Sequence, residues 1–471
     1  MTQGEEMFIG RSSEIEKLNG FYEGDNCCVA VISGGVGVGK TTLLRKFSED
    51  KDVIYIDAYE TTEKQQRKLI SKQLGIDENS EFSAICENIK ERATDKKILL
   101  IIEQYQNIVK ADASFDKTLY EYVCGAWKDL PIKLVLASDA YLFVDKSLKG
   151  KKSLWKDILS LDLELQSFNF FDSLEFLDDA SETEAAFFYG ITGGMAYNLV
   201  KVQQILSTCT EENRIKEVAA KLFLDVNSSV GLNPERIMST ELRELSYYNC
   251  LLTTLASGLN RVNQISQAVE KPKDVVVPYL NSLISIGICK KDTAITETTN
   301  RKKTRYSIRS TGTLFWYKFI AENYDLYMAG DVEALWAKVS ESMAEFMQPV
   351  FVKICGEYLQ EKSVENMLPF TIEELGNWWV NDDEAGTTEG FDIVSLGKCE
   401  GRSATIFCEC YYNKEPIEVA QLKALIEKTK QLKREGDVFY IVFSKAGFNE
   451  NATTISSAIK NIMLISLDEI R

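Results

Sequence analysis

The sequence predicts a multidomain α/β protein, with a parallel sheet near its amino end, a mainly helical middle and a second α/β domain at its carboxyl end. Its 471 residues are enough for about three or four domains of roughly 100–200 residues each. Apolar strands alternate with longer helical stretches from Cys27 to Leu136, which is typical of a parallel sheet covered by helices. From about Ser167 helical periodicity takes over, and the carboxyl-terminal part returns to alternating strands and helices.

Charge and composition exclude several classes of protein. The chain has 54 Lys and Arg against 71 Asp and Glu, so its net charge is −17 and the molecule as a whole repels nucleic acid and acidic membranes. Any contact with DNA must therefore come from a local basic patch. The chain contains no histidine, which excludes Ser–His and Cys–His nucleophile pairs and His-ligated metal centres.

Nothing in the sequence indicates export or a membrane. The start, MTQGEEMFIG, is acidic and lacks the basic and apolar regions of a signal peptide. No apolar run approaches the roughly 20 residues that are needed to span a bilayer. Eleven dispersed cysteines without a CxxC pair are typical of reduced thiols. We therefore expect a cytoplasmic protein with no membrane partner.

A phosphate-binding loop follows the first predicted strand. Val29–Ser33 runs into Gly34-Gly-Val-Gly-Val-Gly-Lys-Thr41 and then into a helix, Thr42–Phe47, which is the strand–loop–helix context that a P-loop requires. Glycines let backbone N–H groups turn inward around the phosphates, and the helix N-terminus adds its positive dipole end. We expect Lys40 to meet the β- and γ-phosphates of ATP and Thr41 to ligate Mg²⁺. The predicted nucleotide-binding residues of this loop are Gly34, Gly35, Val36, Gly37, Val38, Gly39, Lys40, Thr41 and Thr42.

A second nucleotide motif departs from its usual form. The apolar run Leu99–Ile102 leads into Glu103-Gln104, whereas such a strand normally ends in Asp-Glu, with Asp in the magnesium shell and Glu polarising the attacking water. Glu103 can still serve the metal. The neutral Gln104 can orient a water but cannot take a proton from it. Ser138, at the end of the next strand, is a candidate sensor of the γ-phosphate, and the alternative is a strand-end cap.

The middle of the chain contains a segment, Glu241–Arg309, with the pattern of a winged helix-turn-helix. Its predicted elements are helices at Glu241–Ala256, Val262–Ala268 and Asp274–Ser285 and strands at Ile286–Lys290 and Arg301–Arg309. Cations of the wing could bind DNA phosphates, while modules of this kind also serve in protein interactions, and the sequence favours neither interpretation. These cations are Lys290, Lys291, Arg301, Lys302, Lys303, Arg305 and Arg309.

Short motifs follow the P-loop in a definite order along almost the whole chain. They are Ile191–Tyr197, Glu241–Arg243, Tyr279–Gly287, Phe315–Tyr317, Leu375–Trp379 and Phe443–Phe448. With these motifs the chain resembles a group of prokaryotic P-loop ATPases that join an AAA+/STAND-like ATPase domain to a winged helix and a C-terminal domain of restriction-endonuclease fold. In that family, the segment that Phe8-Ile9-Gly10-Arg11 resembles covers adenine, which implies nucleotide contacts for Gly10 and Arg11. The alternative is a plain turn and helix.

Two departures from the family pattern bear on chemistry. The family's arginine in a Leu-Tyr-Gly-Arg segment is Lys156 here, which keeps the charge but loses the forked geometry that grips phosphate oxygens. The nuclease fold needs an Asp on one strand and a Glu-x-Lys on the next, where the carboxylates hold a divalent ion and the lysine orients water. Asp392 and Glu409 take the carboxylate positions, but Tyr411 takes that of the lysine. We therefore expect a binding or structural role for this degenerate nuclease site.

The predicted elements of the carboxyl-terminal domain are strands at Asp392–Leu396, Ala404–Cys410, Val438–Phe443 and Met463–Ser466 and a helix at Ile417–Lys433. The predicted domains are a P-loop ATPase domain (1–165), a helical lid (166–235), a winged helix-turn-helix (236–312), a helical connector (313–365) and a restriction-endonuclease-like domain (366–471).

The function that these observations favour is a nucleotide-dependent switch, which binds ATP with Mg²⁺ between the α/β domain and its lid and hydrolyses it slowly or not at all. One alternative is a competent ATPase, in which another residue or a partner supplies the missing base. Another is a DNA-binding regulator or defence protein. The expected ligands are ATP and Mg²⁺, with DNA as a candidate ligand of the wing, and the sequence does not identify the protein partner.

Overall fold

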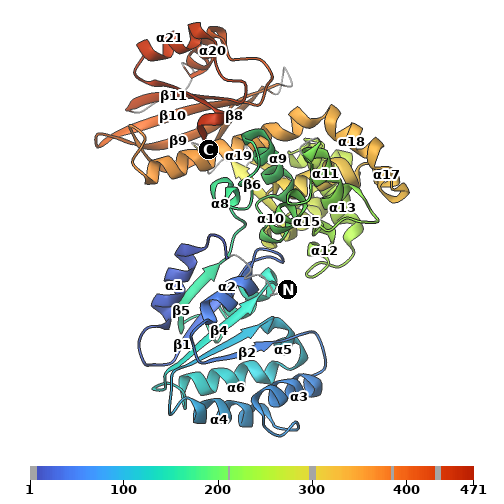
Figure 1. Ribbon diagram of the computed structural model, residues 1–471, viewed down its shortest axis with the longest axis vertical. Coiled ribbons are helices and arrows are strands. Elements are labelled where there is room, and N and C mark those ends of the chain that lie inside the picture. Colours follow the sequence, from blue (N-terminus) through green and yellow to red (C-terminus); the bar gives the residue numbers. More distant parts are fainter. Residues whose placement is uncertain (1–7, 211–212, 296–303, 383–386, 430–435, 471) are drawn as a thin grey trace. The chain divides into compact units, whose positions relative to one another are not determined.

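A computed structural model describes the chain except residues 1–7, 211–212, 296–303, 383–386, 430–435 and 471 (Figure 1). The described residues form two compact units. Unit 1 consists of Met1–Ser167 with Arg236–Arg243, and unit 2 consists of Phe168–Glu235 with Glu244–Arg471. The short segment Arg236–Arg243 therefore belongs to the amino-terminal unit, although unit 2 flanks it in the sequence.

Unit 1 is built on a five-stranded parallel sheet with the strand order β2-β3-β4-β1-β5 (Figure 1). Its strands are β1 (Cys28–Ser33), β2 (Val53–Asp57), β3 (Ile98–Glu103), β4 (Ile132–Ser138) and β5 (Leu159–Glu164). The four strands that the sequence predicts, at Cys27–Ser33, Val53–Asp57, Ile98–Ile102 and Lys133–Ala137, are confirmed with small shifts at their ends. The strands predicted from the sequence do not include β5, an edge strand in which apolar and exposed polar residues alternate.

Helices cover both faces of the sheet of unit 1. They are α1 (Ser12–Tyr22), α2 (Lys40–Ser48), α3 (Glu63–Leu74), α4 (Phe82–Arg92), α5 (Tyr105–Ala111), α6 (Ala113–Cys124) and α7 (Tyr141–Phe143), the last of which continues into a π-helical turn at Val144–Leu148. The central strands β3 and β4 are buried along their whole length, as expected for parallel strands that are covered on both sides. One core contains Phe115, Trp127 and Trp155, and the other contains Leu43 and Phe47.

Unit 2 begins with helices and continues into the segment that the sequence assigns to a winged helix-turn-helix. Its first elements are α8 (Phe170–Leu174), α9 (Glu182–Thr192), α10 (Ala196–Leu206), α11 (Arg214–Ala219) and a π-helical turn at Ala220–Leu224, and α12 (Pro234–Met238) leads out of this unit. The next elements are α13 (Leu245–Ala256), α14 (Val262–Ala268), α15 (Lys273–Ser285) and an antiparallel pair, β6 (Cys289–Thr293) with β7 (Thr304–Ile308). Three helices and a hairpin therefore occur in the predicted order.

Two predicted boundaries in this segment are wrong for local reasons. The first helix begins at Leu245 rather than Glu241, because Glu244 adopts a left-handed conformation with φ 56°. The first strand begins at Cys289 rather than Ile286. There the chain leaves α15 through a C-terminal turn, in which Gly287 has φ 77° and the N–H of Ile288 donates to the carbonyl of Leu283 at 2.9 Å.

A helical connector follows and leads into a mixed five-stranded sheet. The connector contains α16 (Thr311–Phe315), a π-helical turn at Trp316–Ala321, α17 (Tyr324–Ala329), α18 (Val332–Glu341) and α19 (Met343–Val364). The sheet has the order β12-β11-β10-β9-β8, in which β8, β9 and β10 pair antiparallel and β10, β11 and β12 pair parallel. Figure 1 shows α19 on one side of this sheet and α20 and α21 on the other.

The elements of this carboxyl-terminal sheet confirm most of the prediction. They are β8 (Thr371–Asp382), β9 (Thr387–Cys399), β10 (Arg402–Tyr411), α20 (Val419–Thr429), β11 (Asp437–Ser444), α21 (Glu450–Ala458), β12 (Ile462–Ser466) and α22 (Leu467–Ile470). The sequence does not predict β8. The helix predicted at Ile417–Lys433 begins later, and residues 430–435 lie outside the described part of the chain.

The hairpin of β6 and β7 is attached to the carboxyl-terminal sheet. The N–H of Ile295, just after β6, donates to the carbonyl of Asn377 in β8 at 2.9 Å, and a Cβ on Gly376 would lie 3.3 Å from the Cβ of Ile295. The guanidinium of Arg305 lies 4.3 Å from the ring centroid of Trp379, which is almost fully buried. The hairpin and the sheet therefore form one packed assembly inside unit 2.

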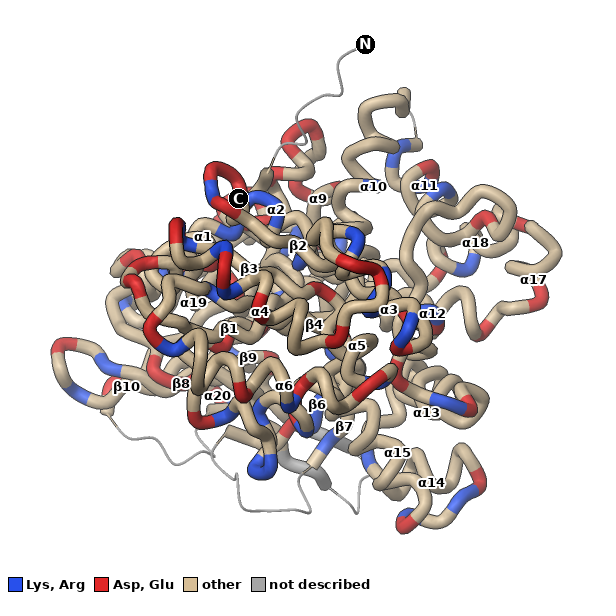
Figure 2. The backbone as a smooth tube through the Cα atoms, turned by 90° about the horizontal axis from the view of Figure 1, so that it is seen from below, with Lys and Arg blue, Asp and Glu red and all other residues tan. Residues whose placement is uncertain are grey.

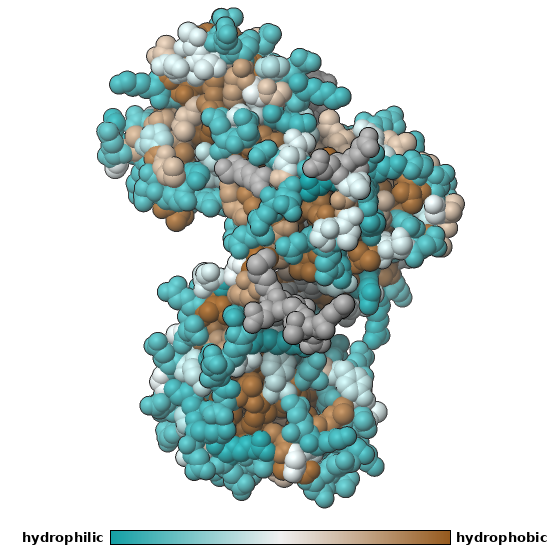
Figure 3. Space-filling model, viewed as in Figure 1, coloured by the Kyte–Doolittle hydropathy of each residue, from teal (hydrophilic) through white to brown (hydrophobic). Residues whose placement is uncertain are grey.

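The surface carries mixed charge. Figure 2 shows basic and acidic residues interspersed along both units, and Figure 3 shows mainly hydrophilic residues on the visible face of each. All eleven cysteines are free. Within the part of the chain that the structure describes, no helix has both the length and the apolar character needed to cross a membrane.

Candidate functional site

The predicted P-loop connects β1 to α2 at the carboxyl edge of the sheet of unit 1. Lys40 is the first residue of α2, and Gly39 precedes it with φ 99°, a left-handed conformation that favours glycine. Gly34 follows β1 directly, where a Cβ would lie 2.7 Å from the carbonyl oxygen of Leu165. Any side chain at position 34 would therefore force the loop away from the sheet.

Lys40 lies inside this loop. Its side chain is 6% exposed, and its ammonium donates to the carbonyls of Gly34 at 2.7 Å and Gly35 at 3.1 Å. Burial lowers the pKa of Lys40, while the negative charges of Asp139 and Glu103 raise it. A buried ammonium with backbone carbonyls as partners can turn to phosphate oxygens without leaving the loop.

Glu103 and Thr41, the predicted magnesium residues, are in direct contact. The hydroxyl of Thr41 donates to one carboxylate oxygen of Glu103, and the hydroxyl of Tyr55 donates to the other at 2.5 Å. Glu103 is 2% exposed. Burial and the bond to Glu103 raise the pKa of Tyr55. The hydroxyl and the carboxylate form an adjacent all-oxygen pair, so these residues fit Mg²⁺, which would keep several waters and bridge to phosphate.

Gln104 belongs to a hydrogen-bond network that the sequence does not predict. Its side-chain N–H donates to Asp139 at 3.1 Å, and its carbonyl accepts from Gln106 at 2.6 Å. Gln106 also donates to the other oxygen of Asp139, at 2.8 Å. Asp139 follows the last residue of β4, and this position at a strand end was the only sequence signal that could have identified it. The structure thus brings a carboxylate to the residue that replaces the catalytic glutamate.

Ser138 lies beside the P-loop, as predicted. It is buried and pairs with Ser33, the last residue before the loop. Its hydroxyl accepts from the N–H of Ala140 at 3.2 Å, which is the contact expected of a strand-end cap. A role in sensing the γ-phosphate stays a prediction.

Gly10 and Arg11 also lie beside the P-loop. Arg11 has φ 62°, and its guanidinium forms an ion pair with Glu14 at 2.9 Å. It also donates to the carbonyls of Val38 at 3.0 Å and Gln166 at 2.6 Å. Arg11 thus links the amino-terminal segment to the loop, while the predicted contact with adenine stays a prediction.

Lys156 does not join this site. β5 runs parallel to β1, with Leu159 beside Val29 and Glu164 beside Ser33, so the residues before Leu159 lie at the amino edge of the sheet. The P-loop leaves the opposite edge, and the side chain of Lys156 is exposed. Strand direction therefore separates Lys156 from the P-loop within unit 1, and its catalytic role stays a prediction.

A contact between Tyr141 and Glu241 connects the P-loop to the segment Arg236–Arg243. The hydroxyl of Tyr141 accepts from the N–H of Gly35 at 3.0 Å. The carboxylate of Glu241 accepts from the N–H groups of Tyr141 at 3.0 Å and Leu142 at 2.8 Å. Burial raises the pKa of Glu241. The sequence shows Glu241 only as part of a motif, and its partners lie about a hundred residues away in the chain.

The degenerate nuclease site of unit 2 contains a lysine that the sequence analysis does not assign to it. Asp392 accepts from the N–H of Cys410 at 2.9 Å, and burial raises its pKa. Glu409 forms an ion pair with Lys428 of α20 at 2.6 Å. Burial and the neighbouring Glu409 raise the pKa of Tyr411 to about 12. A lysine therefore reaches the site, but from a different element than the missing one.

This second site lacks the carboxylates of a full metal centre. Among the described residues, no group of three or more Asp, Glu, Cys or His side chains could hold a metal ion. Two carboxylates, one of them paired with Lys428, are a poor cage for a divalent ion.

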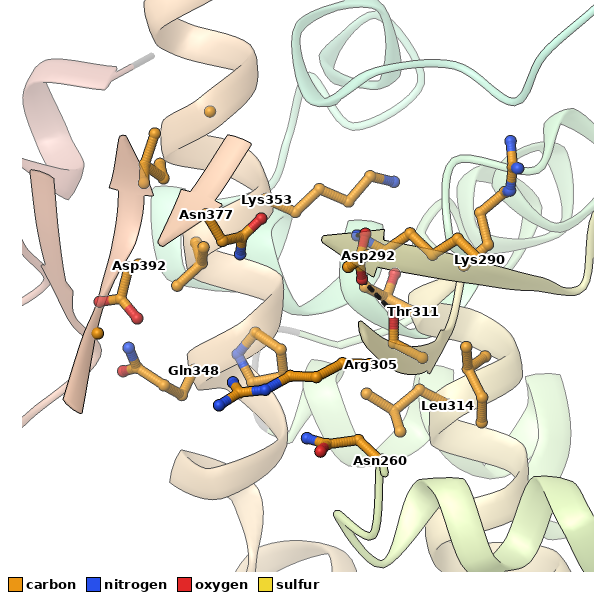
Figure 4. Close-up of a pocket in the computed structure, with 18 of the residues that line it drawn as sticks. Asn260, Lys290, Asp292, Arg305, Thr311, Leu314, Gln348, Lys353, Asn377 and Asp392 are labelled. Carbon is orange, nitrogen blue, oxygen red and sulfur yellow. Dashed lines mark hydrogen bonds and ion pairs between the residues drawn. The ribbon is translucent and has the colours of Figure 1, made fainter. Parts of the chain in front are cut away.

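A cavity of about 800 Å³ lies in unit 2 between the hairpin, α19 and the sheet (Figure 4). Figure 4 shows Arg305 extending from β7 toward Gln348, with Asp392 on the far side on β9. The acidic groups of the lining already have partners: Asp292 accepts from Ser307 at 2.8 Å, and Glu357 accepts from Tyr189 at 2.8 Å. Burial lowers the pKa of Lys353, which lies 3.8 Å from Glu357. The cations of the lining are paired as well: Lys290 lies 3.3 Å from Asp292, and Lys318 lies 2.9 Å from Glu345.

Arg305 does not lie free on a wing surface, as the predicted contact with DNA would require. It packs on Trp379, and burial lowers its pKa to about 10. Arg301, Lys302 and Lys303, which were predicted to bind DNA with it, lie outside the described residues. Arg305 is half-buried and lines the cavity, and a contact of the wing with DNA stays a prediction.

Comparisons with known proteins agree with the geometry of unit 1. Residues 8–202 match a family model described as "ATPase domain predominantly from Archaea", and residues 316–425 match one described as "Archaea bacterial proteins of unknown function". The uncharacterized protein MJECL04 of Methanocaldococcus jannaschii is 26% identical over 396 residues, which cover 83% of this chain and 84% of that protein.

Two solved structures are similar over much of this chain. The Walker-type ATPase PABY2304 of Pyrococcus abyssi is 17% identical, covering 66% of this chain and 96% of its own, with a TM-score of 0.48. The ORC2 protein of Aeropyrum pernix is 15% identical, covering 71% and 98%, also with a TM-score of 0.48. TM-scores below 0.5 do not establish a common arrangement over the aligned length. The family match and the P-loop geometry identify a nucleotide-binding ATPase domain of P-loop NTPase fold.

Proposed function

We propose that this protein is an ATP-dependent switch, which holds ATP with Mg²⁺ at the P-loop and hydrolyses it slowly or not at all. The observation that carries the proposal is Gln104, a neutral amide at the strand end where a glutamate normally polarises water. Lys156, at the opposite edge of the sheet, adds no charge to the site. Slow turnover follows, because the phosphate cradle of Lys40 and Thr41 is intact while the base at its usual position is absent.

The contact of Glu241 supplies a route by which the nucleotide could affect the rest of the chain. Tyr141 touches the P-loop through its hydroxyl and Glu241 through its N–H group. Glu241 precedes α13 by only a few residues. A movement of Gly35 on phosphate binding would therefore be transmitted through Tyr141 and Glu241 to the start of the predicted winged helix-turn-helix. The AAA+/STAND-like character of the switch, its winged helix, its restriction-endonuclease-like domain and its cytoplasmic location are parts of this proposal.

The proposal is tested by identifying the nucleotide that the protein carries. Protein purified without added nucleotide should release ATP rather than ADP on denaturation, measured by ion-exchange chromatography. Protein that carries only ADP would indicate efficient hydrolysis and contradict the switch.

A competent ATPase with a DNA-binding, regulatory or defence role is the second candidate, and the cavity of unit 2 favours it. Lys290 and Lys353 line this cavity together with Asn260 and Asn377, and the two lysines, which lie near Asp292 and Glu357, could turn to phosphate oxygens. DNA affinity that falls steeply with salt, and that Lys353→Ala weakens while the exposed Lys338→Ala does not, would support it. Affinity that is independent of both salt and Lys353 would exclude it.

A further inference from the structure

We infer that Asp139 is the carboxylate that accepts the proton of the attacking water, the role that the sequence pattern places at Gln104. This inference rests on the proposed binding of ATP at the P-loop. It concerns how the site turns ATP over at all, and it names a residue that no motif of the sequence marks.

A carboxylate normally stands directly after the strand that holds magnesium. Here β3 is followed by the amide of Gln104, and β4 is followed by the carboxylate of Asp139. The two strands pair in parallel, so these residues leave the same edge of the sheet, and their side chains meet at 3.1 Å.

The position of Asp139 relative to the phosphate cradle supports a role in the reaction. Ser138, the residue before it, pairs with Ser33, the residue before the P-loop. Asp139 therefore leaves the same edge of the sheet as the P-loop, and it lies close enough to Lys40 for its charge to raise the pKa of that ammonium.

The amides of Gln104 and Gln106 orient this carboxylate. Each donates one N–H group to a different oxygen of Asp139, at 3.1 Å and 2.8 Å. Each carboxylate oxygen keeps a further lone pair for a water proton, and both hydrogen bonds that Asp139 accepts come from neutral amides.

The proton transfer balances within the site. The water oxygen bonds to the γ-phosphorus while the bond from that phosphorus to the β,γ-bridging oxygen breaks, and ADP leaves. One proton of the water passes to an oxygen of Asp139, which later returns it to solvent. The products are ADP, inorganic phosphate and one released proton, and no oxidant or reductant is needed.

The test compares four full-length variants with the wild type in single-turnover phosphate release at saturating ATP and Mg²⁺. Asp139→Asn should lower the rate by about 100-fold, since general-base assistance is typically worth about 10²–10⁴-fold. Asp57→Asn is the matched control. This carboxylate is the last residue of β2, at the same edge of the sheet, and its removal should change the rate less than about threefold, because the side-chain hydrogen bonds of Gln104 go to Asp139 and Gln106.

The exchange variant separates catalysis from a structural role. Gln104→Glu combined with Asp139→Asn keeps one amide–carboxylate contact and returns the base to the end of β3. This double variant should hydrolyse ATP at least about tenfold faster than Asp139→Asn alone. Gln104→Glu alone places two carboxylates about 3 Å apart and should not exceed the wild type. The affinity for ATP, measured by calorimetry, should change less than about threefold in Asp139→Asn.

The outcomes distinguish this inference from the switch on which it rests. Slow wild-type hydrolysis that Asp139→Asn leaves unchanged would overturn the assignment of Asp139 and leave the switch standing. Rapid wild-type hydrolysis that Asp139→Asn abolishes would contradict the switch and support Asp139. A loss of rate in Asp139→Asn that the exchange variant does not recover, together with lost ATP affinity, would show that Asp139 only maintains the fold of the site.

Discussion

Two pairs of neighbouring strands can be compared, β3 with β4 in unit 1 and β9 with β10 in unit 2. At each pair, one side chain expected for catalysis is replaced, and a side chain with the charge of the missing one reaches the site from another element. In unit 1, Gln104 stands where a glutamate is expected, and Asp139 from the next strand lies 3.1 Å from it. In unit 2, Tyr411 stands where a lysine is expected, and Lys428 from α20 lies 2.6 Å from Glu409.

Asp139 and Lys428 differ in their effect on the groups around them. Asp139 is held by the neutral amides of Gln104 and Gln106, and its oxygens keep lone pairs that can accept a proton. Lys428 instead pairs with Glu409, one of the two carboxylates that a metal would need, while Asp392 accepts from its own sheet. A displaced group can restore chemistry only where it does not neutralise its neighbours. We therefore expect chemistry in unit 1 and binding or structure in unit 2.

The largest effect is expected from removal of the ammonium of the P-loop. Lys40→Ala should weaken ATP binding at least about 100-fold, because this buried charge meets two phosphates in a loop that excludes water. Calorimetry with ATP and Mg²⁺ measures the change. Lys46→Ala, on the exposed side of the same helix, should bind as the wild type does. Unchanged affinity in Lys40→Ala would exclude the P-loop as the nucleotide site.

In unit 2, loss of Lys428 should reduce stability rather than activity. Lys428→Met leaves Glu409 partly buried without its cation and should cost about 1–3 kcal/mol at pH 7.5, less than a fully buried pair because both side chains keep some exposure. Burial raises the pKa of Glu409 and Lys428 lowers it, so the variant carboxyl should have the higher pKa.

The pH dependence of this cost follows from that shift. A carboxyl whose folded pKa is raised binds protons more tightly in the folded state, so it costs stability above that pKa, and the cost disappears as the pH falls below the unfolded value. The difference between Lys428→Met and the wild type in urea unfolding should thus shrink toward pH 4. A difference that is constant with pH would show that Lys428 stabilises by packing and not by charge.

A smaller effect is expected at the contact between Glu241 and the turn after β4. Glu241→Gln keeps one acceptor oxygen for two backbone N–H groups, so the amides of Tyr141 and Leu142 should exchange hydrogen faster by about fivefold to tenfold. Hydrogen-exchange mass spectrometry of this turn makes the measurement. The exposed neighbour Glu244→Gln should leave exchange as it is, and equal exchange in all three proteins would remove Glu241 from the proposed route.

No effect at all is expected from the carboxylates of unit 2 on nucleic acid. The wild type should not cleave plasmid or single-stranded DNA with Mg²⁺ or Mn²⁺, and Asp392→Ala should behave identically. Cleavage that disappears with Asp392→Ala or Lys428→Ala would show that the lysine from α20 restores a nuclease and would contradict the comparison of the two sites.

What the sequence could predict was local in the chain. The P-loop, the central strands β1 to β4 and the residues Thr41 and Glu103 are contiguous signals, and the structure confirms the strands and brings these two residues together. The contact of Gln104 with Asp139 depends on the order of strands in the sheet, which periodicity does not give.

The features that the sequence could not supply depend on tertiary structure. Lys428 lies 19 residues from Glu409 and reaches it only because α20 packs over β10 and β11. The position of Lys156 depends on β5, and the packing of Arg305 on Trp379 depends on β8. Neither strand is among those predicted from the sequence.

Slow hydrolysis of ATP is tested most directly by the steady rate of phosphate release by the wild-type protein at saturating ATP and Mg²⁺. With Gln104 at the usual position of the base, turnover should lie far below the 1–10³ s⁻¹ that is typical of enzymes, at roughly 0.1 s⁻¹ or less. ATP should then remain bound for many seconds after mixing. Turnover of about 10 s⁻¹ or more without a partner would contradict the slow switch.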